Sequence, residues 1–345
     1  MVNTAIIGAG YWGANLIRVL SEKSNLVYIV DQNKALLDVK FSDGNYKHVC
    51  KTTDAIIPLE DREVEAVFIA TPPETHFNLA KTALEHGKHV FIEKPMTRSS
   101  EEAKQLVKFA SKRKRLKVAV GHVFLYSEPV KRVTQILQNK TCGCNIEVCP
   151  KQDLGDILHI SMVRQNLGKI QAGCDVIYDL APHDMSMLLH WFPDFDIAEV
   201  KSSLFQHDKR IPADTAVIGI VTKSGMTVQL NYSWIYPRKV REVTFIGSKK
   251  SLVYTDTDPN EPIKIYDKGF ILEPSNFGDY ICSYRTGDCY TPYVNIREPL
   301  SQEVQAFLDC IEFDEPILNT IENGKRVVEL MEKIKGIGHE LSYTG

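Results

Sequence analysis

No long apolar run and no excess of charge of either sign occur in this sequence. No apolar stretch approaches the ~20 residues that a membrane-spanning helix needs. Lys and Arg total 41 against 44 Asp and Glu, which gives a formal net charge of −3. A nearly neutral chain has no electrostatic reason to bind nucleic acid or a membrane surface. The one strongly basic run, 112–115, falls where a helix is expected to end, so we expect neither partner.

Paired cysteine spacing is also absent. The eight cysteines are scattered, and the three that cluster, Cys142, Cys144 and Cys149, have no fourth ligand at zinc-like spacing. We therefore interpret them as part of an idiosyncratic loop rather than as a metal site. The first apolar run meets Gly8, which leaves no room for a signal peptide. These features predict a cytoplasmic chain that binds no metal.

Length and pattern together predict two domains. At 345 residues the chain exceeds one ordinary hydrophobic core. Over the first 120 residues, short apolar runs rich in branched side chains alternate with helical patterns, and these runs are 4–7, 26–30, 66–70, 89–92 and 118–120. Such alternation predicts a parallel, doubly wound sheet. We assign this sheet to a first domain over residues 1–122.

The turn after the first predicted strand carries a dinucleotide-binding pattern. Residues 8–13 read G-A-G-Y-W-G and precede the helical run 14–20. Gly8 permits the tight turn, Gly10 lets the backbone approach a pyrophosphate, and Gly13 permits close helix–strand packing. Asp31 ends the second strand. A carboxylate at this place accepts hydrogen bonds from the ribose hydroxyls and repels a 2′-phosphate. This pattern predicts a Rossmann domain that binds NAD rather than NADP; the alternative is a glycine turn that binds nothing.

Two further motifs follow strands of this domain. Residues 71–73, Thr-Pro-Pro, follow the fourth strand, and Glu93-Lys94-Pro95 follows the fifth. Both motifs stand at carboxyl ends of strands, where doubly wound folds bind ligands. On the residues alone, a solvated charge is the simpler interpretation of Lys94.

From residue 123 the pattern changes to mainly antiparallel strands. The clearest strand is 227–234, where apolar and polar residues alternate, and Ser224-Gly225 joins it to the run 214–221 as a tight hairpin. An apolar helix is predicted over 176–191, and helical patterning returns in the last 45 residues. We assign residues 123–345 to a second α/β domain with one large, open, mostly antiparallel sheet.

Taken together, these features resemble the glucose–fructose oxidoreductase / inositol dehydrogenase (Gfo/Idh/MocA) family. The resemblance covers essentially the whole chain and rests on the glycine loop, Thr71-Pro72 with His76, Glu93-Lys94-Pro95, and the segment D-L-A-P-H-D over 179–184. It implies an NAD-dependent oxidoreductase with a substrate pocket between its two domains. It also implies an open sheet that often serves as an oligomer interface, hence a homodimer or homotetramer. By this resemblance the cofactor contacts would be Gly8, Gly10, Tyr11, Trp12, Gly13, Asp31, Thr71, Pro72, His76, Glu93 and Lys94.

The resemblance further implies a catalytic trio of Lys94, Asp179 and His183. Asp179 and His183 share one helix face if the helix continues through Pro182, although a histidine in an apolar helix is, alone, usually a core residue. His183 would take the hydroxyl proton of an alcohol substrate as the carbon loses a hydride. Asp179 would hold the imidazole, and Lys94 would stabilise the developing alkoxide.

Three segments are similar to members that act on nucleotide-linked sugars, often at C3, such as UDP-N-acetylhexosamines: residues 164–168, residues 179–184 and Ser233-Trp234. Within them, Arg164, Asn166 and His183 would contact the substrate. The chain departs from the family at Ser186, where many members carry an acid, and at 141–153, which looks like an insertion. Two alternative functions remain, an NAD-dependent glycosidase that acts by transient oxidation and a non-catalytic NAD-binding regulator.

Overall fold

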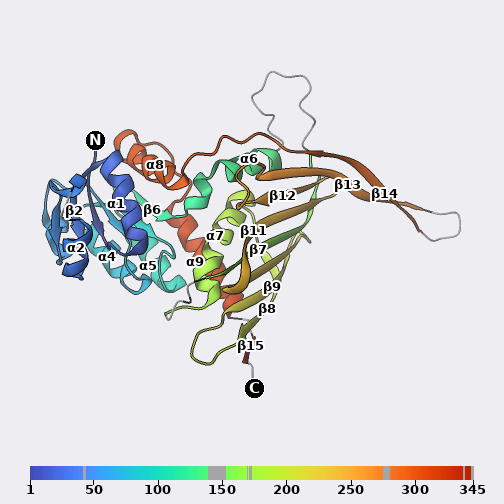
Figure 1. The fold of residues 1–345 in the computed structure, drawn as a ribbon, viewed down its shortest axis with the longest axis horizontal. Helices are drawn as coiled ribbons and strands as arrows, with labels where there is room; N and C mark the ends of the chain where they lie inside the picture. Colours follow the sequence, from blue (N-terminus) through green and yellow to red (C-terminus); the bar gives the residue numbers. More distant parts are fainter. Residues whose placement is uncertain are drawn as a thin grey trace. The chain divides into compact units, whose positions relative to one another are not determined.

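The computed structural model describes residues 1–41, 44–138, 153–168, 170, 173–274, 280–336 and 339–342. The chain forms two compact units (Figure 1). The first contains residues 1–126 and 298–332, and the second contains residues 127–297 and 333–345. None of the helices in the described part of the chain has the length and apolar character of a membrane span. Cys142, Cys144 and Cys149 lie outside the described residues.

The first unit is built on a parallel sheet in the strand order β3-β2-β1-β4-β5-β6, which confirms the predicted doubly wound fold. Its strands are β1 Asn3–Ile7, β2 Asn25–Val30, β3 Cys50–Thr52, β4 Ala66–Ile69, β5 His89–Glu93 and β6 Val118–Gly121. Its helices are α1 Tyr11–Lys23, α2 Lys34–Lys40, α3 Ile56–Glu60, α4 Pro73–Glu85, α5 Ser100–Ser111, α8 Pro299–Phe313 and α9 Ile321–Lys335, with short 3₁₀ turns η1 Gly44–Tyr46 and η2 Val123–Tyr126.

Both faces of this sheet are buried, as a parallel sheet requires. Ile6, Phe68 and Phe91 project to one face, where α1 and α8 cover them. The alternate residues project to the other face, which α4, α5 and the first turns of α9 cover. Strands β4 and β6, for example, therefore read as continuous apolar runs rather than as alternating ones.

Helix α8 belongs to the first unit, whereas the sequence assigned it to the second domain. Val304, Phe307 and Leu308 pack in the same core cluster as Phe68 and Phe91, and the Phe307 ring lies edge-on to both of those rings. The helical period of α8 was predicted correctly. Its period does not say which sheet the apolar face will cover, and residues 298–332 were assigned to the second domain for this reason.

The second unit is built on a nine-stranded sheet in the order β14-β13-β12-β11-β7-β10-β9-β8-β15. Its strands are β7 Ile157–Leu167, β8 Ile197–Gln206, β9 Thr215–Thr222, β10 Thr227–Ser233, β11 Ile235–Gly247, β12 Ser251–Thr255, β13 Ile263–Pro274, β14 Tyr280–Tyr290 and β15 His339–Ser342, and its helices are α6 Glu128–Leu137 and α7 Val176–Trp191. The pairs β7–β10 and β8–β15 are parallel and the others antiparallel. This arrangement confirms the predicted open, mostly antiparallel sheet.

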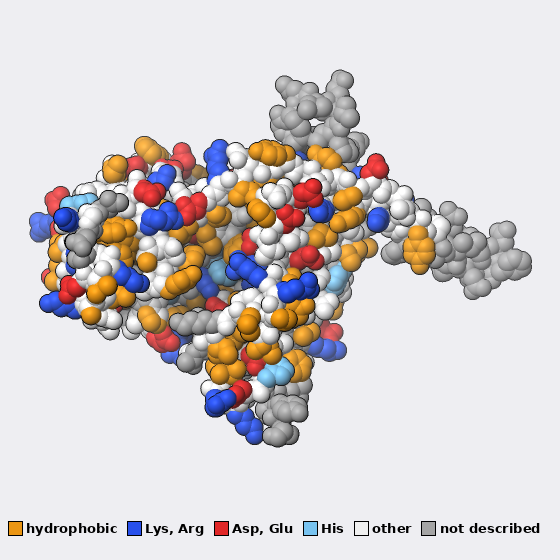
Figure 2. All heavy atoms as spheres, viewed as in Figure 1, with side chains coloured by type: hydrophobic (Ala, Val, Ile, Leu, Met, Phe, Trp, Pro, Cys, Tyr) orange, Lys and Arg blue, Asp and Glu red, His pale blue; other side chains and the backbone are white. Residues whose placement is uncertain are grey.

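Charged side chains of both signs are interspersed over the face of the molecule shown in Figure 2. The mixture matches the small formal net charge of −3. Neither sign gathers there into the continuous patch that binding to a polyanion would use.

Candidate active site

The glycine loop connects β1 to α1 with the geometry that a bound diphosphate requires. Gly8 has a positive φ of 102°, and a Cβ atom built on it would lie 2.5 Å from the Ala70 carbonyl oxygen. A Cβ on Gly13 would lie 2.0 Å from the Gly8 carbonyl oxygen, so the strand and helix pack too closely for a side chain. Gly10 caps the amino end of α1 without a side-chain hydrogen bond. The first amides of α1 and the helix dipole are thus available to an anion.

A cavity of about 730 Å³ opens beside this loop at the carboxyl ends of the strands. Five of the predicted cofactor contacts line it, namely Gly8, Gly10, Asp31, Thr71 and Pro72. The remaining predicted contacts, Tyr11, Trp12, Gly13, His76, Glu93 and Lys94, do not line this cavity.

Asp31 is fixed at the end of β2 by two backbone donors. Its Oδ2 accepts a hydrogen bond from the Ala9 amide at 2.8 Å, and its Oδ1 accepts one from the Asn33 amide at 2.9 Å. The carboxylate therefore ties the glycine loop to the second strand. Its place beside the cavity is the one where an acid meets the ribose hydroxyls of a dinucleotide.

His76 has a structural position. Its side chain is fully buried in α4, and its two ring nitrogens lie 2.8 Å from the Thr71 carbonyl oxygen and 2.9 Å from that of Pro95. Burial lowers the pKa of the imidazole, so the ring is neutral and donates through one nitrogen at a time. His76 joins the loop after β4 to the turn after β5, and its contact with the cofactor stays a prediction.

Glu93 is the last residue of β5 and Lys94 follows it, and the two side chains differ in their exposure to solvent. Glu93 is buried, and its carboxylate accepts hydrogen bonds from the Trp12 indole nitrogen and from the Lys94 amide. Burial raises the pKa of Glu93 to about 7, against the lowering effect of those two donors and of the Lys94 charge. Lys94 itself is only partly buried, and a cis peptide bond joins it to Pro95.

In the second unit, α7 presents Asp179 and His183 one helical turn apart. The helix begins after Asp175, whose side chain accepts a hydrogen bond from the Tyr178 amide at 3.0 Å, and it continues unbroken through Pro182. Asp179 Oδ2 accepts a hydrogen bond from the Trp234 indole nitrogen at 3.0 Å. Asp179 and His183 are partly exposed, whereas most of α7 is buried. Lys94 belongs to the first unit, so its convergence with His183 on one carbon stays a prediction.

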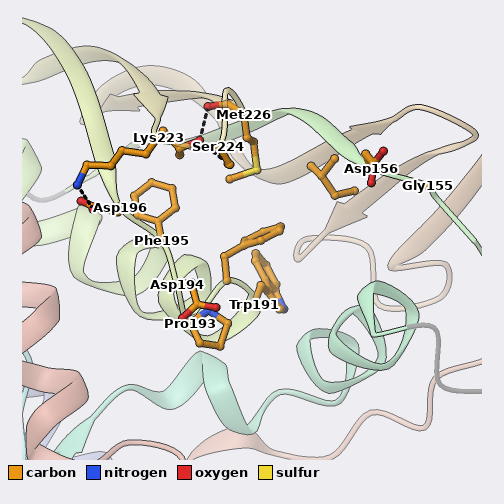
Figure 3. Close-up of a pocket in the computed structure, with 13 residues that line it drawn as sticks. Gly155, Asp156, Trp191, Pro193, Asp194, Phe195, Asp196, Lys223, Ser224 and Met226 are labelled. Carbon is orange, nitrogen blue, oxygen red and sulfur yellow. Dashed lines mark hydrogen bonds and ion pairs between the residues drawn. The ribbon is translucent and has the colours of Figure 1, made fainter.

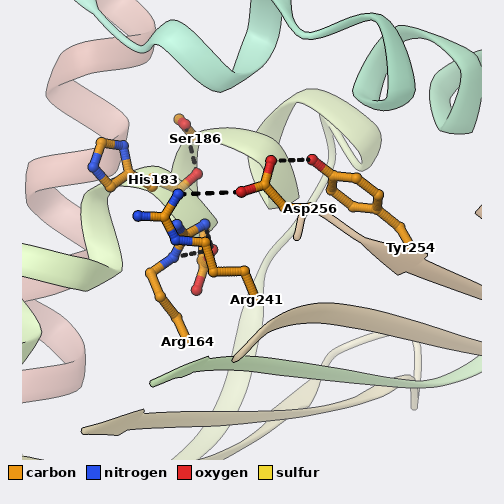
Figure 4. Close-up of polar contacts among 7 residues, drawn as sticks. Arg164, His183, Ser186, Arg241, Tyr254 and Asp256 are labelled. Atoms are coloured by element: carbon orange, nitrogen blue, oxygen red, sulfur yellow. Dashed lines mark hydrogen bonds and ion pairs between the residues drawn. The ribbon is translucent and has the colours of Figure 1, made fainter. Parts of the chain in front are cut away.

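Arg164 is buried against α7 instead of facing outward. Its guanidinium donates to Asp184 Oδ1 through Nε at 3.0 Å and Nη2 at 2.5 Å (Figure 4). Arg164 is 4% exposed and Asp184 2% exposed. Arg164 thus forms a buried ion pair that holds α7 to β7, and its substrate contact stays a prediction. Sequence reasoning could not say which of many acids an arginine on a strand would meet.

Asn166 and Trp234 lie together because β7 and β10 run parallel. The two strands place Gln165 opposite Ser233, and the Gly168 amide donates to the Trp234 carbonyl oxygen at 2.9 Å. A Cβ on Gly168 would lie 2.5 Å from Asn166 Nδ2 and 3.7 Å from Trp234 Cδ1. Asn166 is partly exposed, so it stands beside the tryptophan that holds Asp179. This is compatible with its predicted role.

Two polar residues on neighbouring strands were missed by the sequence reasoning. Arg241 of β11 lies opposite Arg164 in the sheet and donates to Asp256 at 3.1 Å, and Asp256 also accepts from the Tyr254 hydroxyl at 3.1 Å (Figure 4). Only the register of β11 against β7 reveals this neighbour. No periodic pattern in the sequence signals it.

A second cavity of about 570 Å³ lies at the carboxyl end of α7 (Figure 3). Aromatic side chains including Trp191 and Phe195 line it, together with the ion pair between Lys223 and Asp196 at 2.5 Å. None of the predicted site residues line this cavity. Among the described residues, no group of three or more potential metal ligands is present.

Comparison with known proteins places these two units in a known architecture. Residues 2–122 match the oxidoreductase family with an NAD-binding Rossmann fold, and residues 150–253 match the GFO/IDH/MocA C-terminal domain. The UDP-N-acetylglucosamine 3-dehydrogenase of Acidithiobacillus ferrooxidans is 26% identical over 334 residues, which make up 95% of this chain and 94% of that protein. The oxidoreductase P35 of Formosa agariphila is 28% identical over 207 residues, which make up 56% of this chain and 62% of that protein.

Solved structures share the fold of the whole chain. The A. ferrooxidans UDP-N-acetylglucosamine 3-dehydrogenase superposes with a TM-score of 0.78 at 21% identity, covering 98% of this chain and 97% of that one. The 3-ketoreductase KijD10 of Actinomadura kijaniata, in complex with NADP and TDP-benzene, superposes with a TM-score of 0.79 at 16% identity, covering 99% of each chain.

Proposed function

Because this chain belongs to the Gfo/Idh/MocA family of oxidoreductases, we propose that it transfers a hydride between NAD and a ring carbon of a nucleotide-linked sugar. The proposed carbon is C3, and the proposed substrate is a UDP-N-acetylhexosamine. The relative that is similar over 95% of this chain acts on UDP-N-acetylglucosamine as a 3-dehydrogenase, and this full-length similarity supports the substrate class.

The first unit has the groups that NAD needs. The glycine loop and the amino end of α1 would hold the diphosphate, and Asp31 would accept the ribose hydroxyls. A carboxylate there repels a 2′-phosphate, which supports NAD over NADP. When bound, the nicotinamide accepts or returns a hydride. The glycine loop fits this group because it leaves open space beside Gly10. No described atom beyond its chain neighbours lies within 4 Å of a Cβ built there, so a diphosphate has room to approach the backbone.

One observation carries the catalytic assignment. Lys94, Asp179 and His183 are each partly exposed, while Glu93, which binds the Lys94 amide, and Trp234, which binds Asp179, are buried. Reactive groups held on buried supports are what a catalytic site requires. A set of merely solvated charges would have no need of such supports.

In the proposed mechanism these three residues handle the proton of the substrate hydroxyl. The His183 imidazole takes that proton as the carbon is oxidised and gives it back in the reverse direction. Asp179 stabilises the imidazolium that forms. The Lys94 ammonium donates to the substrate oxygen and stabilises its developing negative charge.

We also propose that the chain assembles as a homodimer or homotetramer in the cytoplasm. The face of the sheet opposite α7 exposes apolar side chains of β9, including Val217 and Val221. Such a face is suited to contact a second copy of the sheet.

The test is a reaction of purified protein with UDP-N-acetylglucosamine and either NAD or NADP, followed at the NADH absorbance band and by mass of the product. We expect a keto sugar nucleotide with matching NADH, and faster turnover with NAD. Release of free sugar without net NADH would instead identify a glycosidase. NAD binding without turnover of any nucleotide sugar or free sugar would identify a regulator.

A further inference from the structure

Three titratable side chains are buried in the first unit and take no part in the proton transfer of the proposed mechanism. They are Glu93 at the end of β5, His122 directly after β6, and Glu303 on α8, with exposures of 7%, 1% and 0%. β5 and β6 pair Glu93 with Gly121, and a Cβ on Gly121 would lie 2.8 Å from Glu93 Oε2. The Glu93 carboxylate thus lies directly against the backbone that leads to His122.

Glu303 approaches the same backbone from α8. Its Oε1 accepts a hydrogen bond at 3.0 Å from Asn319 Nδ2, which also donates to the Val120 carbonyl oxygen at 2.7 Å. The Tyr126 hydroxyl donates to Asn319 Oδ1 at 2.8 Å and fixes the orientation of the amide. Glu93 and Glu303 therefore flank the segment Val120–His122.

The hydrogen bonds of Glu303 fit a protonated carboxyl group. Its Oε2 is buried and meets no hydrogen-bond partner among the described residues. An ionised carboxylate with one oxygen in that position would have a large desolvation cost, whereas a protonated group has only the smaller cost of a hydroxyl without an acceptor. Burial, and next the charge of Glu93, hold the pKa of Glu303 well above its usual range.

His122 is neutral for a similar reason. Neither ring nitrogen meets a hydrogen-bond partner within the described part of the chain, and an imidazolium would need an acceptor at both. Burial lowers the pKa of His122 to about 3, and the nearby Lys94 charge acts in the same direction.

Glu93 differs because both of its oxygens have donors. Oε1 accepts from the Trp12 indole nitrogen and Oε2 from the Lys94 amide at 3.2 Å. The groups that act on Glu93 are thus Trp12 from α1 and Lys94, directly after β5, and the charge of Glu93 in turn raises the pKa of Glu303 on α8. Among the two acids, Glu93 is the one whose negative charge the surroundings stabilise.

We propose that Glu303 holds a proton while Glu93 is ionised, and that Glu303, acting through Glu93, is a positioning residue for Lys94. A neutral Glu303 and a neutral His122 leave Glu93 as the one anion of this cluster, so the charge beneath Lys94 depends on Glu93 alone. Protonation of Glu93 removes that charge and weakens the acceptor of Trp12 and of the Lys94 amide. The link to turnover rests on the proposed function, but the assignment of the proton does not.

The first test is infrared spectroscopy of the full chain at a pH well above the pKa of Glu93. In the wild-type protein we expect the carbonyl stretching band of a buried, protonated carboxylic acid, and this band should shift in D₂O. In Glu303→Gln the band should be absent. The absence of this band from the wild-type spectrum, or its persistence in Glu303→Gln, would overturn the proposal. The infrared measurement needs no turnover, so its result does not depend on whether the proposed function is correct.

The second test is the pH profile of turnover. Glu303→Gln keeps a neutral side chain of the same shape. The fall of its turnover rate at low pH, the acid limb of the profile, should therefore coincide with that of the wild type. Glu303→Ala admits water beside Glu93, which should move the acid limb to lower pH by about one unit. Leu308→Ala, a cavity variant on the same helix, should lose stability without moving the limb. The positioning role would be refuted if the acid limb stayed fixed in Glu303→Ala. It would also be refuted if the acid limb moved in Leu308→Ala as it does in Glu303→Ala.

Discussion

Asp179 accepts a hydrogen bond from the indole nitrogen of Trp234. The hydrogen bond of 3.0 Å joins a side chain of α7 to the residue directly after β10, and a hydrogen bond to a charged group is worth about 1.5–3 kcal/mol. Trp234→Phe removes the donor but keeps an aromatic ring. We expect kcat to fall by about 10- to 100-fold, measured in steady state with the wild-type substrate.

The control for this change is Trp191→Phe. Trp191 is equally aromatic and buried on α7, where its ring lies edge-on to Phe245, but it is not bonded to Asp179. Its replacement should change stability more than kcat. Equal kcat in Trp234→Phe and the wild type would show that the indole nitrogen does not support catalysis.

Glu93 makes folding stability depend on pH in a defined direction. Its pKa is 4.5 for the ordinary group and about 7 in the folded chain, so the folded state binds this proton more tightly than the unfolded state. The resulting stability is fully present below pH 4.5 and is lost as pH rises through about 7. Glu93→Gln cannot ionise and should therefore be more stable than the wild type above that pH, by up to about 3 kcal/mol in urea unfolding.

His122 changes the folding stability with pH in the opposite direction to Glu93. Its pKa falls from 6.5 to about 3 on folding, so its contribution is present above pH 6.5 and is lost as pH falls. Because His122 is present in both proteins, the difference between Glu93→Gln and the wild type isolates Glu93. A difference that does not grow between pH 4.5 and pH 7 would contradict the raised pKa of Glu93.

At the scale of elements, local patterns were enough to predict α7, the hairpin of β9 and β10, and the glycine loop. Each follows from residues that are close in sequence: a helical period, a Ser-Gly turn, or three spaced glycines. The parallel pairing of β7 with β10 could not be predicted, because the two strands are far apart in the sequence and their patterns do not encode direction. That pairing brings Asn166 to Trp234, and the buried partner of Arg164 depends on it as well.

Helix α8 offers a prediction at the same scale. Phe307 is fully buried against Phe68 and Phe91 of the first unit, and removing such a ring costs about 3–5 kcal/mol. Phe307→Ala should therefore destabilise the parallel sheet, seen as faster hydrogen exchange of β4 and β5 amides. Phe313→Ala, at a side chain that is 67% exposed, should leave exchange unchanged. Unchanged exchange in Phe307→Ala would mean that α8 does not support the first unit.

At the scale of the whole molecule, the chain builds its first unit from two separate stretches. Residues 298–332 return to complete a sheet made by residues 1–126. The sequence predicted the classes of both sheets but divided the chain at a single boundary, because an apolar helix face carries no information about its partner. Likewise, Lys94 was chosen through the family resemblance, because its place after a strand alone indicated a solvated charge, whereas the neighbouring buried acids became visible only when α8 and β6 were placed together.

The proposed function requires that Lys94 and His183 act on the same substrate oxygen. A double-mutant cycle of Lys94→Met, His183→Asn and the combined variant tests it most directly, with Lys104→Met at an exposed lysine as the control. Each single change should lower kcat by about a hundredfold or more while NAD binding persists. The combined variant should be little worse than the poorer single variant, because residues that act as a unit are not additive. Losses that multiply in the combined variant, or a fully active Lys94→Met protein, would contradict the account.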